Sequence, residues 1–195
     1  MTVKEVEAMM SENISRIKEI RKTYDPLTGE GSISVPRKKV TIRKCPIETM
    51  YLPCDMAETP FIKLLEKIGF DGFIKEATGR CPDAFSMNLY WTEFNRFRIQ
   101  YDFEFWAYIL TVISEKGEGR DIPFLLNRAQ RKYLKTLEEL RLAGKPIDVI
   151  LLKARQWGGS TLTQIYMLWI QLVHKRNWNS AICGAVKSQA STVTG

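Results

Sequence analysis

IDVILLKARQWGGST, residues 147–161, is the stretch of sequence that decides the fold. Its first six residues are apolar apart from Asp148 and rich in β-branched side chains, which predicts a short buried strand over 147–152. A compact loop over 153–161 follows. Residues 162–175 then predict a helix, and residues 180–186 predict a second buried strand. Strand, glycine-containing loop, helix and strand in this order form a βαβ unit.

The loop has the glycines of a phosphate-binding turn but not its usual lysine. In P-loop proteins, successive backbone N–H groups and the positive end of a helix point at a polyphosphate. The standard pattern is G-x-x-x-x-G-K-[ST], and the lysine position here holds Gly159 or, one register on, Ser160. A cation from the start of the loop, Lys153 or Arg155, must then replace that lysine. The alternative interpretation is an ordinary glycine turn between strand and helix.

The whole loop resembles the variant Walker A loop of the large terminase subunits of tailed bacteriophages. These proteins are ATPases that pump DNA into procapsids, and their loops often read Arg-Gln-x-Gly-x-[Ser/Thr]. In some members the lysine stands at the beginning of the loop. The chain departs from many terminases at Gly159, where they have lysine, and both Lys153 and Arg155 stay candidates for the main phosphate-binding cation.

The resemblance implies a set of site residues. Lys153 and Arg155 are the expected catalytic cations, and the hydroxyl of Ser160 is the expected Mg²⁺ ligand, with Thr161 as the alternative. Trp157 is expected to pack against the core or the nucleotide. The expected ATP-binding residues are Gln130, Lys153, Ala154, Arg155, Gln156, Trp157, Gly158, Gly159, Ser160 and Thr161.

Gln130 joins this set because of its position. It stands near the start of a helix predicted over 126–142, one element before the loop. Its side-chain amide offers both a donor and an acceptor to the edge of adenine. Terminases, like many helicases, have such a Q motif before Walker A, and Leu126-Asn-x-x-Gln130 is similar to it. Taken alone, Gln130 is far more typical of a helix surface than of an adenine site.

Composition and charge narrow the class of protein. The chain has 195 residues, 45% hydrophobic and 26% charged, which is typical of a folded domain, and its net charge of +7 suits a polyanionic partner. The four cysteines have no CxxC spacing and His174 is the only histidine, which favours free thiols over a zinc site. The first residues lack the apolar core of a secretory signal, and the apolar helix is too short to span a bilayer.

We predict three segments. Residues 1–58 combine an amphipathic helix over 2–23 with an extended, proline-punctuated segment. Residues 59–120 form a helical, aromatic adaptor region with a hairpin, and residues 121–195 begin a P-loop ATPase domain with Q motif, variant Walker A and first βαβ. The predicted fold class is therefore α/β: a mainly helical N-terminal region, then the first βαβ of a RecA-like parallel sheet, truncated.

Local signals predict several elements of the N-terminal region. Pro60 opens a helix that stops at Gly69, and a short second helix is closed by Gly79. Apolar runs over 109–113 and 122–126 flank a glycine-rich loop and predict a β-hairpin. Aromatic residues at helical spacing predict a core-facing stripe rather than a base-stacking surface: Trp91, Phe94, Phe97 and Tyr101.

A basic run precedes these elements. Arg37, Lys38 and Lys39 stand before Val40-Thr-Ile42, and Arg43 and Lys44 follow it. Lysines on an edge strand discourage aggregation, whereas the same residues could contact a phosphate backbone. The strand interpretation is favoured.

The resemblance implies the N-terminal, ATP-binding part of a viral packaging motor. Its expected ligands are ATP and Mg²⁺, and its expected partners are double-stranded DNA, the small terminase subunit and the portal protein, with a homo-oligomeric ring in the full-length protein. The expected location is the cytoplasm of the infected bacterial host, with no membrane. No strand ending in an acidic pair follows Val186, so neither Walker B nor the nuclease domain is expected here, and whether this chain is itself an enzyme stays open. A non-enzymatic nucleic-acid-binding module and another P-loop ATPase, such as a helicase, are the alternatives.

Overall fold

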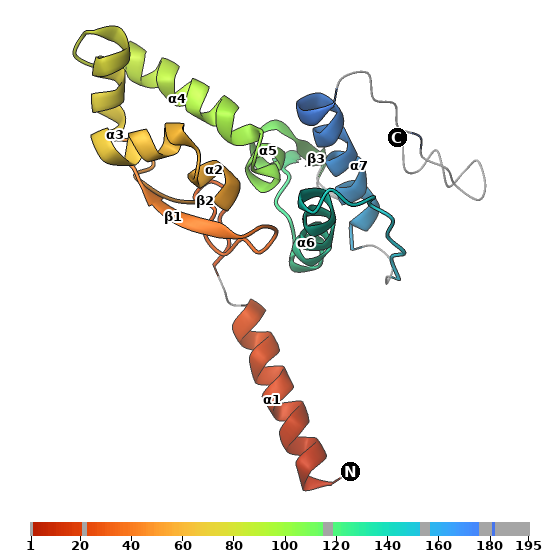
Figure 1. The fold of residues 1–195 in the computed structure, drawn as a ribbon. Helices are drawn as coiled ribbons and strands as arrows, with labels where there is room; N and C mark the ends of the chain where they lie inside the picture. Colours follow the sequence, from red (N-terminus) through yellow and green to blue (C-terminus); the bar gives the residue numbers. More distant parts are fainter. Residues whose placement is uncertain (1, 21–22, 115–118, 153–156, 176–180, 182–195) are drawn as a thin grey trace.

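The computed structural model describes residues 2–20, 23–114, 119–152, 157–175 and 181, and these residues form a projecting helix and two lobes (Figure 1). The fold is mixed, with helices predominating over two small antiparallel hairpins. Helix α1 (Val3–Ile20) stands apart from both lobes, as Figure 1 shows. Its presence confirms the amphipathic helix predicted over 2–23.

The first lobe is a hairpin covered by helices. Strands β1 (Arg37–Thr41) and β2 (Thr49–Pro53) pair antiparallel, with Val40 opposite Met50. Helices α2 (Cys54–Ala57), α3 (Pro60–Thr78) and α4 (Ala84–Ile99) follow. The edge strand predicted from the basic run is confirmed, while β2 occupies chain that was predicted only as extended. The core of this lobe consists of Val40, Ile42, Cys45, Met50, Leu52, Met56, Ala57, Ile62, Leu65, Phe70, Ile74 and Phe94.

Helix α3 begins at Pro60 and ends before Gly79 as predicted, but at Gly69, where a stop was predicted, it kinks and continues. The side chain of Thr59 accepts a hydrogen bond from the Ile62 N–H, and Pro60 occupies the first turn. Gly69 breaks the helix with φ 82° and ψ 169°, a backbone conformation that residues with a Cβ rarely adopt. Gly79 ends it in the left-handed conformation.

The aromatic stripe of α4 faces the core of the first lobe, as predicted. Trp91 stacks on Phe94 with ring centroids 5.2 Å apart, and Phe97 meets Phe61 of α3 edge-to-face at 5.2 Å. Phe94 is completely buried. These rings are therefore occupied in packing rather than presented to bases.

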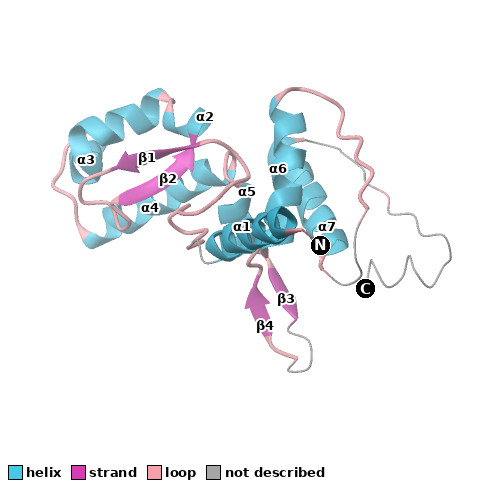
Figure 2. Ribbon diagram, turned by 90° about the horizontal axis from the view of Figure 1, so that it is seen from below, coloured by secondary structure: helices cyan, strands magenta, loops and turns pink. Residues whose placement is uncertain are grey.

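The second lobe contains the remaining helices. Helix α5 (Phe103–Leu110) leads into strands β3 (Val112–Ser114) and β4 (Asp121–Pro123), which form a short antiparallel hairpin that projects from the lobe (Figure 2). Helix α6 (Arg128–Leu142) follows, and α7 (Gly159–Trp169) continues into one π-helical turn, η1 (Ile170–His174). The predicted hairpin is confirmed but shorter, because residues 109–110 belong to α5 and Phe124 and Leu126 enter the core.

The core of the second lobe lies between α5, α6 and α7. Its buried members are Phe103, Trp106, Ala107, Phe124, Leu126, Leu134, Leu137, Leu162, Tyr166 and Trp169. Helix α7 and η1 are not buried on every side in the described structure, since Leu168 is 42% exposed and Leu172 is 69% exposed. In the described part of the chain, α5 and α6 pack against one side of α7 and leave the opposite side open.

The strand predicted over 147–152 does not form in the described structure. These residues have no regular secondary structure, and Ile150 and Leu152 are fully exposed. A strand exists only when a neighbouring strand pairs with its backbone. The predicted partner over 180–186 lies outside the described residues except for Ala181, so the described residues contain no parallel sheet.

A buried ionic network joins the two lobes. Asp102, which caps α5, receives two hydrogen bonds from Arg37 at 2.7 and 2.9 Å and two from Arg98 at 2.9 and 3.0 Å. Glu104 accepts from Arg37 at 3.0 Å and from Ser34 at 2.8 Å. Burial opposes the charge on Asp102, but the two guanidinium groups outweigh it and lower the pKa of Asp102 to about 2. The network therefore keeps its charges paired within the core.

Candidate functional site

The candidate site is built from the end of the predicted phosphate loop and the start of α6. Four of its predicted residues, Lys153, Ala154, Arg155 and Gln156, lie outside the described residues. The others are described: Gln130, Trp157, Gly158, Gly159, Ser160 and Thr161. The described part of the loop is therefore its glycine end.

Gln130 contacts this loop directly. Its Nε2 donates a hydrogen bond of 3.0 Å to the carbonyl oxygen of Gly158, and its side chain is almost completely buried. Its Oε1 accepts a hydrogen bond of 2.9 Å from the Asn127 N–H. Both ends of the amide are thus bonded to protein, and reading adenine would require Gln130 to exchange one of these bonds.

Asn127 is a site residue that the sequence analysis missed. Its Oδ1 accepts from the Gln130 N–H at 2.9 Å and completes a capping box at the start of α6. Its Nδ2 donates to the carbonyl oxygen of Trp157 at 3.0 Å. Asn-x-x-Gln at the start of a helix is itself a capping signal, and it could have identified the residue. Asn127 and Gln130 together hold two consecutive carbonyl groups of the loop.

Close packing explains why two glycines stand side by side. Gly158 adopts φ 79°, and a Cβ there would lie 2.6 Å from the Gln130 Nε2. A Cβ on Gly159 would lie 2.6 Å from the ring of Trp157. That ring in turn meets Tyr133 of α6 edge-to-face, with centroids 6.1 Å apart. A side chain at position 158 would therefore displace Gln130, and one at position 159 would displace the Trp157 ring.

The N-terminus of α7 has no side-chain cap among the described residues. Gly158 is its N-cap and supplies no side-chain oxygen, whereas the cap residues of α3, α4, α5 and α6 each do. The N–H groups of a helix's first turn have no acceptor within the helix. At α7 these belong to Gly159, Ser160 and Thr161, and Ser160 is exposed. Three N–H groups at the positive end of a helix suit an anion such as phosphate.

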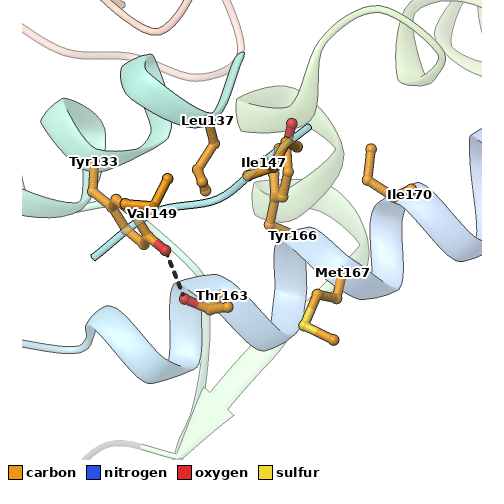
Figure 3. Close-up of a pocket in the computed structure, with 8 residues that line it drawn as sticks. All are labelled: Tyr133, Leu137, Ile147, Val149, Thr163, Tyr166, Met167 and Ile170. Atoms are coloured by element: carbon orange, nitrogen blue, oxygen red, sulfur yellow. Dashed lines mark hydrogen bonds between the residues drawn. The ribbon is translucent and has the colours of Figure 1, made fainter. Parts of the chain in front are cut away.

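A mainly apolar cavity of about 390 Å³ lies between α6, α7 and the 147–149 segment (Figure 3). The hydroxyl groups of Tyr133 and Thr163 lie 3.3 Å apart at its edge, within hydrogen-bond distance. Ile147 and Val149 line it, whereas Ile150 and Leu152 are fully exposed. Its lining residues are Tyr133, Leu137, Ile147, Val149, Thr163, Tyr166, Met167 and Ile170.

Buried polar contacts fix α7 against α6 beneath the site. The hydroxyl of Tyr166 donates to Glu138 at 2.6 Å, and Arg141 donates two bonds to the same carboxylate at 2.7 and 2.8 Å. Burial, followed by the Glu138 carboxylate, raises the pKa of the Tyr166 hydroxyl. The tyrosine therefore remains a neutral donor at physiological pH. These bonds hold the second half of α7 against α6.

The described residues offer no preformed metal centre. Within them, no group of three His, Cys, Asp or Glu side chains is arranged to hold a metal ion. The hydroxyl of Ser160 stays the predicted Mg²⁺ ligand, at the exposed start of α7. Among the described helices, none combines the length and the apolar character needed to cross a membrane.

No family model, curated protein or solved structure matches this chain.

Proposed function

We propose that this chain is the ATP-binding N-terminal part of a DNA-packaging ATPase of the terminase large-subunit type. The observation that carries the proposal is the hydrogen bond from Gln130 to the carbonyl group of Gly158. The sequence predicts these two motifs separately, an upstream glutamine and a glycine loop before a helix. Their direct contact is the arrangement expected of one nucleotide site.

The chemistry of the site suits a triphosphate. The first turn of α7 has no side-chain cap and supplies N–H donors, and Ser160 in that turn is exposed. Gly158 and Gly159 leave room for Gln130 and the Trp157 ring to pack against the loop backbone. In the proposal, Lys153 and Arg155 supply the positive charge that the missing Walker lysine would supply. The Ser160 hydroxyl would ligate Mg²⁺ bound to the phosphates. Gln130 holds the loop in place for these contacts.

The wider setting belongs to the same proposal. Within a packaging motor, ATP binding at this site would drive movement of double-stranded DNA, with the small terminase subunit and the portal protein as partners. The motor would act as a homo-oligomeric ring in the host cytoplasm.

The fold proposed for this region places residues 147–152 and 180–186 as neighbouring parallel strands. Strands of a parallel sheet are buried on both faces and are therefore apolar throughout. The apolar side chains of Ile150 and Leu152, fully exposed among the described residues, fit such a strand and support this fold.

Isothermal titration calorimetry with Mg·ATP tests the proposal. We expect the chain to bind Mg·ATP, and we expect Lys153→Ala and Arg155→Ala each to weaken binding. A hydrogen bond to a charged group contributes about 1.5–3 kcal/mol, so each loss should be roughly 10- to 100-fold. Lys145→Ala is the matched control, because Lys145 is an exposed cation outside the loop.

Two results would contradict the proposal. One is unchanged Mg·ATP affinity in both loop variants and in the double variant. The other is no binding of ATP together with strongly salt-dependent binding of DNA that Arg155→Ala leaves unchanged, which would favour the nucleic-acid-binding module.

A further inference from the structure

A second cavity of the second lobe is lined mainly by basic side chains. It has a volume of about 610 Å³ and lies between the C-terminal ends of α6 and η1. It shares Ile147 and Ile170 with the apolar cavity of Figure 3. Within the described part of the chain, no carboxylate belongs to its lining, whereas four basic residues do: Arg141, Lys145, His174 and Lys175.

Trp169 holds two of these basic side chains in place. Its side chain is completely buried. The Arg141 guanidinium lies 5.1 Å from the centroid of the Trp169 ring, and the His174 ring meets the same ring edge-to-face with centroids 4.4 Å apart. Arg141 donates to Glu138 from Nε and Nη2, and its Nη1 takes part in neither bond. The guanidinium is therefore fixed in position with donors left for a ligand.

The cavity carries an excess of positive charge. Glu138 offsets the charge of Arg141, but among the described residues neither Lys145 nor Lys175 pairs with a carboxylate. Partial burial lowers the pKa of His174, and the charges of Arg141 and Lys175 lower it further, while Glu138 acts in the opposite direction. Two ammonium groups thus stand beside a guanidinium and an imidazole, and a bound anion would relieve their repulsion.

Helix capping does not account for the two lysines. Cations often stand at helix C-termini, where they offset carbonyl groups that lack a partner. At the end of α6, the Gly144 N–H bonds the Arg141 carbonyl and the Lys145 N–H bonds the Leu140 carbonyl, both at 3.0 Å. At the end of η1, the Lys175 N–H bonds the Ile170 carbonyl at 2.9 Å. Backbone groups make these caps, so the ammonium groups remain available to a ligand.

We propose that this cavity is a second phosphate-binding site, separate from the candidate nucleotide site. It takes the phosphate group of a small phosphate compound or of a nucleic acid backbone. Lys145 and Lys175 supply the charge, and Nη1 of Arg141 supplies directed donors. The two sites share no residue and lie at opposite ends of the continuous α7–η1 helix, roughly 20 Å apart at 1.5 Å per residue. The proposal is therefore independent of ATP binding.

His174 provides a local probe, because it is the only histidine in the chain. Its imidazole resonances can be followed by NMR over the pH range in which the ring titrates, with and without metal-free pyrophosphate, at constant ionic strength set with KCl. An anion beside the ring favours its protonated form. We expect saturable binding and a rise of roughly one unit in the pKa of His174.

A double variant tests the assigned cations. Lys145→Ala/Lys175→Ala should weaken pyrophosphate binding roughly 10-fold or more, and the rise in the His174 pKa should disappear at the concentration that saturates the wild type. Lys4→Ala/Lys18→Ala removes the same charge from exposed positions of α1 and should respond like the wild type. Lys153→Ala/Arg155→Ala should also respond like the wild type, which separates this proposal from the ATP site.

A short DNA duplex identifies the source of the phosphate. If the site takes backbone phosphates, the duplex should shift the His174 resonances and compete with pyrophosphate. If it takes small compounds, only pyrophosphate should do so. His174 resonances that neither ligand changes would overturn the proposal. An equal response in the wild type and in Lys145→Ala/Lys175→Ala would also overturn it, because the cavity lysines would then not hold the anion.

Discussion

Gln130 illustrates how one side chain can serve both a helix and a loop. Its acceptor oxygen completes the cap of α6, and its donor nitrogen holds the carbonyl group of Gly158. A buried amide is stable only when its polar atoms are bonded, so the position of the loop and the identity of the residue depend on each other. The absence of a Cβ at Gly158 is what lets the amide come this close.

Gln130→Glu separates these two roles. Glutamate keeps the acceptor that caps α6 but loses the donor to Gly158, and it puts a carboxylate beside a carbonyl oxygen. We expect weaker Mg·ATP binding and a loss of about 1–3 kcal/mol in the free energy of unfolding. Calorimetry and urea unfolding measure the two quantities, with Gln100→Glu at the exposed end of α4 as control. Wild-type ATP affinity in Gln130→Glu would show that the contact does not position the loop.

The helical elements could be predicted from the sequence because their signals are local. Thr59-Pro60 and Asn127 start helices through contacts within four residues, and Gly69 and Gly79 interrupt or end α3 through their own backbone angles. The aromatic stripe of α4 could be assigned to the core because its spacing matched one helix face. No distant residue was needed for these predictions.

The strand elements could not be predicted in the same way. A strand depends on a partner that the local sequence does not specify, so the apolar run 147–152 was predicted as a strand although none of the described residues pairs with it. Conversely, β2 was missed because Pro53 at its end and Pro46 before it indicate extended chain, whereas the strand forms by pairing with β1. Local sequence predicts secondary structure best where its hydrogen bonds are also local.

The sequence predicted the order of the site's motifs along the chain but not the contacts between their side chains. The sequence placed Gln130 one element before Gly158, and the structure brings them together. Asn127 and Tyr133 were not foreseen, because their roles depend on where residue 157 lies after an intervening chain of many residues. Order along the chain predicts which motifs meet, whereas packing decides which atoms meet.

At the scale of the molecule, Asp102 joins the two lobes, and its charge links stability to pH. Its pKa is about 2 in the folded protein against an ordinary value of 3.8. The folded state therefore holds this proton less tightly than the unfolded state. The resulting stabilisation is present above about pH 4 and is lost as the pH falls towards 2. One pKa unit corresponds to about 1.4 kcal/mol, so the contribution is about 2 kcal/mol.

Asp102→Asn should remove this pH dependence. We expect the free energy of unfolding of the variant to fall less steeply between pH 4 and pH 2 than that of the wild type. At neutral pH the variant should be about 3–5 kcal/mol less stable, because Arg37 and Arg98 lose their shared carboxylate. Urea unfolding at a series of pH values measures both effects, with the exposed Asp121→Asn as control. Equal slopes in wild type and Asp102→Asn would contradict the assigned role.

The central claim is that the glycine end of the loop and the first turn of α7 bind the phosphates of ATP. The most direct measurement is an NMR titration of the ¹⁵N-labelled chain with Mg·ATP. We predict that the largest amide shifts belong to Gly158, Gly159, Ser160 and Thr161, with smaller shifts for the capped first turn of α4. Saturable shifts centred on these four amides would support the account. Unchanged amides at saturating Mg·ATP, or shifts confined to other parts of the chain, would contradict it.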